Sequence, residues 1–300
     1  MVFASGIFLF LFLPMILCIY YAPVIKSIHV KNMVLLFGSL LFYAWGEPIF
    51  FFLMIFSILV TYYVGVLIEK FQNQKRKKKT VLIISVVYDI IMLFVFKYVS
   101  FFTYEIAKLF HLDYAVNISL PIGVSFFTFQ MMSYVFDIYY GTVAVQRNII
   151  NLALYISLFP QLIAGPIVRY ENIDKELDAR IVYKNDIYEG LKRFIFGLGK
   201  KVLLADYLAI IADNIFDYTS MVSVANAWLG AIAYSLQIFF DFSGYSDMAI
   251  GLGRMFGFHF PENFNYPYIS KSVTEFWRRW HMSLSGWFRD YVYIPLDNMK

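Results

Sequence analysis

A histidine near the carboxyl-terminal end of the sequence is the side chain best suited to carry chemistry. His281 follows two tryptophans and two arginines in the run Glu275–Ser285, and six ionisable residues lie between Val273 and Pro295. An unpaired charge at the centre of an apolar membrane helix costs about 2.5–3.5 kcal/mol on insertion scales. We therefore expect these side chains to line a polar cavity or to pair with one another. The six are Glu275, Arg278, Arg279, His281, Arg289 and Asp290.

Helical spacing predicts what surrounds this histidine. Glu275 would reach Arg279 one turn on, and Trp277 would stack beneath His281, which leaves the imidazole free to face a cavity. Burial lowers the pKa of a histidine, so its neutral, basic form would be present near neutral pH. Such a base can take the proton of a hydroxyl group as that group attacks a thioester carbonyl, which accelerates the reaction by roughly 10²–10⁴. An interfacial histidine in a belt of aromatic and arginine side chains is an equally open interpretation.

Two carboxylates interrupt another apolar run. Asp241 and Asp247 lie within Gln237–Asp247, and an acidic residue in such a run is a candidate for a site or a pathway. They would orient the histidine or pair with arginines, although pairs that only hold helices together carry equal weight. Ser246 does not fit a G-x-S-x-G nucleophile elbow because Met248 stands where glycine is needed, which excludes serine-hydrolase chemistry. The candidate partners of the two carboxylates are His281, Arg254, Arg278 and Arg279.

A third segment, Phe159–Arg169, contains two prolines and a glycine within seven residues. This pattern predicts a helix end or a re-entrant turn at membrane depth. Small residues also permit close approach of helices, which is the alternative. Of the remaining histidines, His29 lies in a predicted cytoplasmic loop and His111 at the end of a span, so neither suggests a site, and for His259 a packing role is favoured over a functional one. The sequence contains no metal-ligand set, glycine-rich phosphate loop or dinucleotide fingerprint, so neither a metal nor a bound cofactor is expected.

The elements that must position these residues are membrane helices. Hydrophobic residues make up 60% of the chain and charged residues 15%, whereas an average soluble domain has about 25% charged residues. A transmembrane helix needs about 20 mostly apolar residues. The four clearest spans are predicted near 5–24, 32–46, 48–68 and 80–100. Weaker candidates, interrupted by glycine, proline or charge, are predicted near 116–136, 150–165, 188–211, 226–241, 242–257 and 273–295.

Basic residues in short loops predict the orientation of these spans. Lys26 and Lys31 lie between the first and second spans, and Lys70 with the run Lys75–Lys79 lies between the third and fourth. Because short cytoplasmic loops are rich in lysine and arginine, we expect both loops in the cytoplasm and the amino terminus outside. The net charge of +4 sits in such clusters, which argues against nucleic-acid binding. A phosphoinositide or nucleic-acid patch at Lys75–Lys79 is the less favoured interpretation.

Five segments together resemble a known family. In order along nearly the whole chain, these segments resemble the membrane-bound O-acyltransferase (MBOAT) family, specifically its bacterial alginate O-acetylation (AlgI-like) branch. A related branch, the D-alanyl transfer proteins of teichoic acid modification, fits the same segments less well. The segments are Leu120–Gln130, Gln161–Tyr170, Phe240–Phe258, Pro261–Pro267 and Thr274–Pro295.

The resemblance implies an all-α, polytopic integral membrane protein. About 8–10 transmembrane or re-entrant helices would surround a central tunnel, in a single domain over residues 1–300. Within it, residues 1–110 would supply the amino-terminal spans and residues 111–300 the catalytic core. The implied location is the bacterial cytoplasmic membrane, among membrane lipids.

The resemblance also assigns the histidine. His281 matches the first of two active-site histidines of the family, in its Trp-Arg-Arg-Trp-His motif. In relatives the second histidine lies in a downstream Trp-His-Gly motif, which does not occur in this sequence. Relatives continue with further helices where this sequence ends at Asp297–Lys300. We therefore expect a carboxy-terminally truncated chain, whose activity alone is in question.

The implied reaction moves an acetyl group from a cytoplasmic donor, acetyl-CoA or another acyl thioester, to a polysaccharide hydroxyl outside the cytoplasm. The transfer would be direct or would use a periplasmic or surface acetyltransferase as partner. His281 would act as general base or acyl relay, Arg278 and Arg279 would steer the anionic donor, and the two aspartates would orient polar groups. The residues expected to line the tunnel are Asp241, Ser243, Tyr245, Asp247, Trp277, Arg278, Arg279, Trp280 and Ser283.

Two rival functions remain open at this point. A transporter or flippase for a lipid-linked sugar would need no covalent chemistry, but it predicts paired inverted repeats, which are not evident in the sequence. A D-alanyl transfer protein would share the architecture and differ in the acyl group that it carries.

Overall fold

The computed structural model describes residues 2–111, 116–163, 165–217 and 223–297. Within these ranges the chain is helical and contains no β-strand, only an isolated antiparallel bridge between Phe264 and Trp280. The predicted all-α fold class is therefore confirmed. The central tunnel and the number of spans stay predictions.

Three helices are long and apolar enough to cross a membrane, namely α2 (Ile28–Gly46), α3 (Phe50–Lys70) and α4 (Lys75–Leu109). They match three of the predicted spans, although α4 begins inside the basic run and extends nine residues beyond the predicted end. Large apolar side chains on these helices face outward, as expected where lipid is the solvent. The first predicted span is shorter than expected, because η1 (Phe8–Phe12) and α1 (Leu13–Tyr20) together cover thirteen residues.

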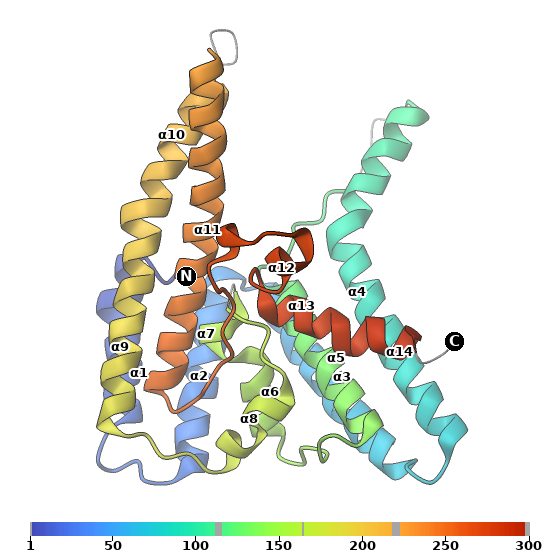
Figure 1. Cartoon of the computed structure of the whole chain (residues 1–300). Helices are drawn as coiled ribbons and strands as arrows, with labels where there is room; N and C mark the ends of the chain where they lie inside the picture. The colour runs from blue at the N-terminus through green and yellow to red at the C-terminus, as the bar shows by residue number, and fades with distance from the viewer. Residues whose placement is uncertain (1, 112–115, 164, 218–222, 298–300) are drawn as a thin grey trace.

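The two basic loops lie at the same end of the molecule. In Figure 1 the connections from α1 to α2 and from α3 to α4 both run along the lower edge. Their common position agrees with the expectation that both loops lie on one side of the membrane.

A short buried helix occupies the predicted re-entrant segment. All four residues of α7 (Phe159–Leu162) are buried, and the ring of Phe159 packs against a cluster of phenylalanines from three other helices. Gly123 approaches the Leu162 carbonyl so closely that a Cβ there would lie 2.5 Å from its oxygen. Ala164, within the predicted turn, lies outside the described residues. Along the chain, α7 follows α5 (Val124–Tyr140) and α6 (Ile149–Ser157) and precedes α8 (Tyr170–Asp178).

A long helical hairpin packs beside this centre. Its first arm is α9 (Lys184–Gly199), continued by η2 (Lys200–Ala205) and α10 (Asp206–Asp217), and its second arm is α11 (Val224–Met255). Figure 1 shows the two arms side by side over their whole length. The two spans predicted at 226–241 and 242–257 are wrong, because they form one continuous helix.

The glycines of that helix pair with glycines of α9. A Cβ on Gly190 would lie 2.6 Å from the Gly251 carbonyl oxygen, and a Cβ on Gly197 would lie 2.6 Å from that of Gly244. The glycines therefore serve close packing of α9 on α11 rather than a turn. The pairs are seven residues apart on each helix, so both fall on the same face.

The predicted span at 273–295 is also wrong. The chain forms α12 (Val273–Trp277), reverses at His281 in a left-handed conformation with φ of 45°, and resumes as α13 (Met282–Phe288). The break lies in the middle of the predicted helix, so this segment does not cross the membrane as one rod. The remaining elements are η4 (Pro267–Ile269), η5 (Arg289–Tyr293) and α14 (Ile294–Asp297).

Candidate active site

A short antiparallel contact holds the histidine. Residues 263–265 run alongside 279–282, with the bridge between Phe264 and Trp280 at the centre. This contact fixes the left-handed turn at His281. His281 lies outside the three helices of membrane-spanning length and is 8% exposed.

Asn263 determines which nitrogen of the imidazole carries the proton. Its Oδ1 lies 3.0 Å from Nδ1 of His281 and accepts from the hydroxyl of Ser283 at 2.8 Å and from the amide N–H of Ser283 at 3.3 Å. A backbone N–H can only donate, which identifies the side-chain atom of Asn263 facing it as the oxygen. Nδ1 of His281 is therefore protonated, and Nε2 carries the lone pair of a base.

The imidazole is packed as well as hydrogen-bonded. The ring of Phe242 meets that of His281 edge-on, with centroids 4.8 Å apart. Trp277, predicted to stack beneath the histidine, is half exposed instead, because the chain reverses between the two residues. Burial lowers the pKa of His281 to about 4, so the ring is neutral near pH 7.

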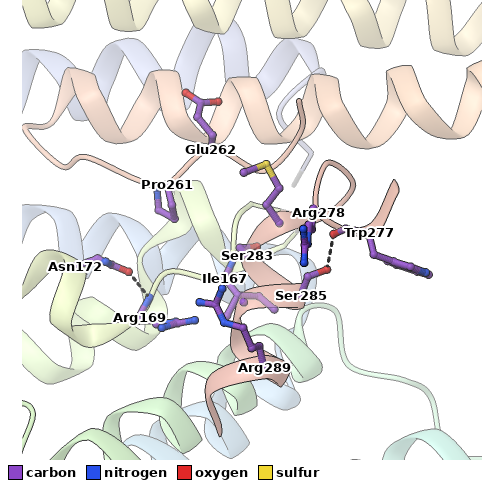
Figure 2. A pocket seen from close by; sticks show the side chains of 12 residues that line it. Ile167, Arg169, Asn172, Pro261, Glu262, Trp277, Arg278, Ser283, Ser285 and Arg289 are labelled. Atoms are coloured by element: carbon purple, nitrogen blue, oxygen red, sulfur yellow. Dashed lines mark hydrogen bonds between the residues drawn. The ribbon is translucent and has the colours of Figure 1, made fainter. Parts of the chain in front are cut away.

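The larger of two cavities near His281 is cationic. It has a volume of about 550 Å³, and Figure 2 shows Arg169, Arg278 and Arg289 among the side chains around it. Asp290 accepts from Arg169 and from Arg289, at 2.6 Å in each case. Arg278 makes no ion pair with any residue of the described ranges. The cavity therefore has positive charge to offer an anion. Its other lining residues are Ile167, Asn172, Pro261, Glu262, Trp277, Met282, Ser283, Ser285 and Gly286.

The smaller cavity has balanced charges. It has a volume of about 160 Å³ and lies where α11 meets α9 and the segment before the bridge. Asp247 accepts from Arg193 at 2.9 Å and from Lys200 at 2.6 Å, and Arg193 donates to Glu262 at 2.6 Å. The predicted partners of Asp247 were wrong, since its cations come from α9 and η2. The lining residues are Arg193, Lys200, Phe239, Ser243, Ser246, Asp247, Glu262, Asn263, Phe264 and Tyr266.

His281 itself lines neither cavity, but residues in contact with it or near it in the chain line both. Asn263, its hydrogen-bond partner, lines the smaller cavity, and Ser283, two residues further along the chain, lines the larger one. Glu262 lines both. The neutral imidazole beside these residues is a candidate proton acceptor.

The structure brings five of the predicted tunnel residues to these cavities. Ser243 and Asp247 line the smaller cavity, and Trp277, Arg278 and Ser283 line the larger one. Their roles in catalysis stay predictions.

Four other predicted tunnel residues line neither cavity. Lys201 lies 2.7 Å from Asp241, and Tyr245 packs on Phe3. Pairing of Asp241 with an arginine was therefore wrong. Arg279 pairs with Glu275 at 3.0 Å, as helical spacing predicts, and the ring of Trp280 packs on that of Phe264.

Sequence reasoning missed several residues that line the cavities. Asn263, Arg193 and Lys200 hold the site together, yet none was predicted as part of it. Arg193 and Lys200 are seven residues apart, the same interval as the glycines beside them, which is a detectable helical-face signal. Asn263 gives no local signal, because its partners are 18 and 20 residues further along the chain.

The described residues contain no group of three or more His, Cys, Asp or Glu side chains close enough to hold a metal ion.

An all-helical fold with lipid-facing helices around a buried polar site defines an integral membrane protein. The sequence profile of MBOAT, the membrane-bound O-acyltransferase family, matches residues 144–300. The chain belongs to this family. The profile lies within the part predicted as the catalytic core, while the division at residue 110 stays a prediction.

Several curated relatives resemble the chain. The probable alginate O-acetylase AlgI of Pseudomonas aeruginosa is 45% identical over 305 residues, covering 100% of this chain and 58% of the relative. The peptidoglycan O-acetyltransferase of Helicobacter pylori is 34% identical over 334 residues, covering 100% of this chain and 62% of the relative. The teichoic acid D-alanyltransferase of Bacillus subtilis is 33% identical over 186 residues, covering 59% of this chain and 46% of the relative. The chain thus spans 58% and 62% of the length of the first two.

Proposed function

We propose that this protein takes part in moving an acetyl group from a cytoplasmic thioester to hydroxyl groups of an extracytoplasmic polysaccharide. The observation that carries the proposal is the neutral imidazole of His281, held by Asn263 with Nε2 as its basic atom, beside residues that line two polar cavities. Membership of the acyltransferase family and the names of the two acetyltransferase relatives support the reaction type.

The proposed step is acyl transfer assisted by a general base. The acceptor oxygen attacks the carbonyl carbon of the acetyl thioester and forms the new C–O bond, while Nε2 of His281 takes the hydroxyl proton. The tetrahedral intermediate then breaks its C–S bond, and the imidazolium returns the proton to the departing thiolate. The products are the acetyl ester and a free thiol. A positioned base of this kind contributes roughly 10²–10⁴ in rate.

The larger cavity suits the donor. Acetyl-CoA carries phosphate groups, and arginine is the side chain that binds phosphate best because its planar fork donates two hydrogen bonds. Arg278 is the guanidinium of this cavity without an acidic partner among the described residues. We assign donor entry to the side of the basic loops, which we place in the cytoplasm.

The remaining parts of the proposal concern location and partners. We place the protein in the bacterial cytoplasmic membrane, with its amino terminus outside and its basic loops inside. The polysaccharide acceptor would be an alginate-like polymer or a cell-wall glycan, by analogy with the named relatives. A separate acetyltransferase outside the cytoplasm would receive the acetyl group if transfer is not direct.

The test removes the imidazole of His281 and keeps the left-handed backbone conformation at this residue. Asparagine tolerates left-handed backbone better than other residues, so His281→Asn keeps the conformation at this position. Membranes with equal amounts of the full-length gene product, wild type or variant, receive a radiolabelled acetyl thioester and the polymer. We expect transfer of label to fall by roughly 10²–10⁴. The matched control is His259→Asn, whose side chain is 61% exposed and pairs with Glu176. Undiminished transfer by His281→Asn would reject the proposed role.

A further inference from the structure

Three buried polar groups in the smaller cavity have no partner among the described residues. They are Nδ2 of Asn263 and the hydroxyls of Ser243 and Ser246, and the three side chains belong to residues 0–2% exposed. Buried polar groups in proteins are nearly always hydrogen-bonded. Groups of this kind that line one cavity mark a place where a bound molecule supplies the missing partners.

The charges of this cavity favour an uncharged part of a ligand. Arg193 and Lys200 are matched by Asp247 and Glu262 in ion pairs of 2.6–2.9 Å. A phosphate or carboxylate placed here would compete with these carboxylates for the two cations. The hydroxyls and the amide remain available, and they recognise uncharged oxygen atoms.

The walls and the size of the cavity fit one ring. Phe239, Phe264 and Tyr266 add aromatic surface to the polar groups. A volume of about 160 Å³ corresponds to roughly five water molecules at about 30 Å³ each, which is the scale of a single sugar ring. A sugar ring has hydroxyls at its edge and apolar C–H groups on its faces, matching both kinds of wall.

We propose that the smaller cavity is the subsite for the hydroxyl-bearing part of one sugar ring of the acceptor, and that Asn263 connects this subsite to His281. This inference rests on the proposed function. Oδ1 of Asn263 holds Nδ1 of the imidazole, and Nδ2 of the same amide donates to a ring hydroxyl. Ser243 and Ser246 bind neighbouring hydroxyls from α11. Binding of the acceptor and orientation of the base thus depend on one side chain.

The first test removes the hydroxyls. The double variant Ser243→Ala, Ser246→Ala loses two hydrogen bonds to the hydroxyls of the ring. We expect the KM for a short oligosaccharide of the acceptor to rise about tenfold, with the KM for acetyl thioester unchanged within twofold. Ser235→Ala on the same helix is the control, because its hydroxyl bonds the Ala231 carbonyl at an exposed position. If the double variant does not fold, judged by its gel-filtration profile, each single variant is measured.

The second test separates positioning from packing. Asn263→Asp keeps an oxygen beside Nδ1 of His281 but replaces the donor by a carboxylate. A carboxylate at this distance stabilises the imidazolium, so the acidic limb of the rate profile moves to higher pH by about 1–3 units. The acceptor KM also rises, because Nδ2 is lost. Asn265→Asp, with an exposed side chain two residues away, is the control and leaves the profile unchanged.

The outcomes distinguish this inference from the proposed function. If His281→Asn abolishes transfer but the serine and asparagine variants match the wild type, the subsite is wrong and the base assignment stands. A rise in the donor KM instead of the acceptor KM also overturns the subsite. If His281→Asn itself retains full transfer, the proposed function fails first.

Discussion

Adding one methyl group at Gly197 tests whether the contact between α9 and α11 supports the site. In the variant Gly197→Ala the new Cβ would lie 2.6 Å from the Gly244 carbonyl oxygen and 2.8 Å from the Met248 amide nitrogen. Ordinary contacts of a Cβ begin near 3.4 Å, so the backbones would have to separate by roughly 0.8 Å at this point. The ion pairs of Asp247 with Arg193 and Lys200 hold the helices on both sides of the contact.

The magnitude follows from two opposing effects. Overpacking a well-packed contact costs about 1–3 kcal/mol, and replacing glycine by alanine inside a helix returns about 0.5–1 kcal/mol. We expect a net loss of about 1–2 kcal/mol in the free energy of unfolding, which lowers Tm by roughly 2–3 °C for a chain of 300 residues. The smaller cavity, which depends on the same helix contact, should lose acceptor affinity in parallel.

The control is two residues away. A Cβ on Gly199 would meet nothing within 4 Å, so Gly199→Ala should gain about 0.5–1 kcal/mol from helix propensity alone. The assay is thermal unfolding of the detergent-solubilised protein, followed by the loss of its monodisperse gel-filtration peak. Equal Tm values for the two variants would refute the reasoning.

Two further predictions concern charges at the site. Burial lowers the pKa of His281 from its usual value of about 6.5 to about 4. As the pH falls, the imidazole of the unfolded chain therefore binds a proton before that of the folded chain does. The free energy of unfolding falls between pH 6.5 and pH 4 for this reason, by about 3 kcal/mol in total. Lowering the pH from 7 to 4.5 should therefore reduce the free energy of unfolding of the wild type more than that of His281→Asn. An equal reduction in the two proteins would contradict the burial of this ring. Removing the unpaired guanidinium by Arg278→Ala should raise the donor KM about 10–100-fold, from loss of a charge-assisted bond of about 1.5–3 kcal/mol. Arg147→Ala, at a side chain 79% exposed, should leave it within twofold, and an unchanged donor KM in Arg278→Ala would remove that residue from the donor site.

The apolar runs predicted the membrane helices well because lipid-facing segments carry their signal locally. Each residue of α2, α3 and α4 needs only to be apolar, and the runs are long enough to identify. The same measure failed in α11, which was predicted as two spans, 226–241 and 242–257. The helix contains Gly244 and Gly251. Their purpose is contact with α9, and the partner of a glycine cannot be found from the glycine alone.

The site was predicted only in part, because only some of its signals are local in the sequence. The cluster of ionisable residues around His281 indicated a buried polar site, because charged residues in an apolar segment must pair with one another or line a polar cavity. The reversal at residue 281 was not foreseeable from the local pattern, since it is held by Asn263 in another segment. Likewise, the cations that neutralise Asp247 come from 47 and 54 residues earlier in the chain.

The ion pairs of the smaller cavity also bear on the electrical insulation of the membrane. Polar cavities shorten the apolar path that keeps protons and ions from crossing. Here the acidic and basic groups of that cavity neutralise one another, and the imidazole of His281 is uncharged near neutral pH. Among the described residues, the charges that line the smaller cavity are therefore paired, and we expect this cavity to add little to ion leakage through the bilayer. Close packing of the glycines between α9 and α11 brings these paired charges together across the two helices.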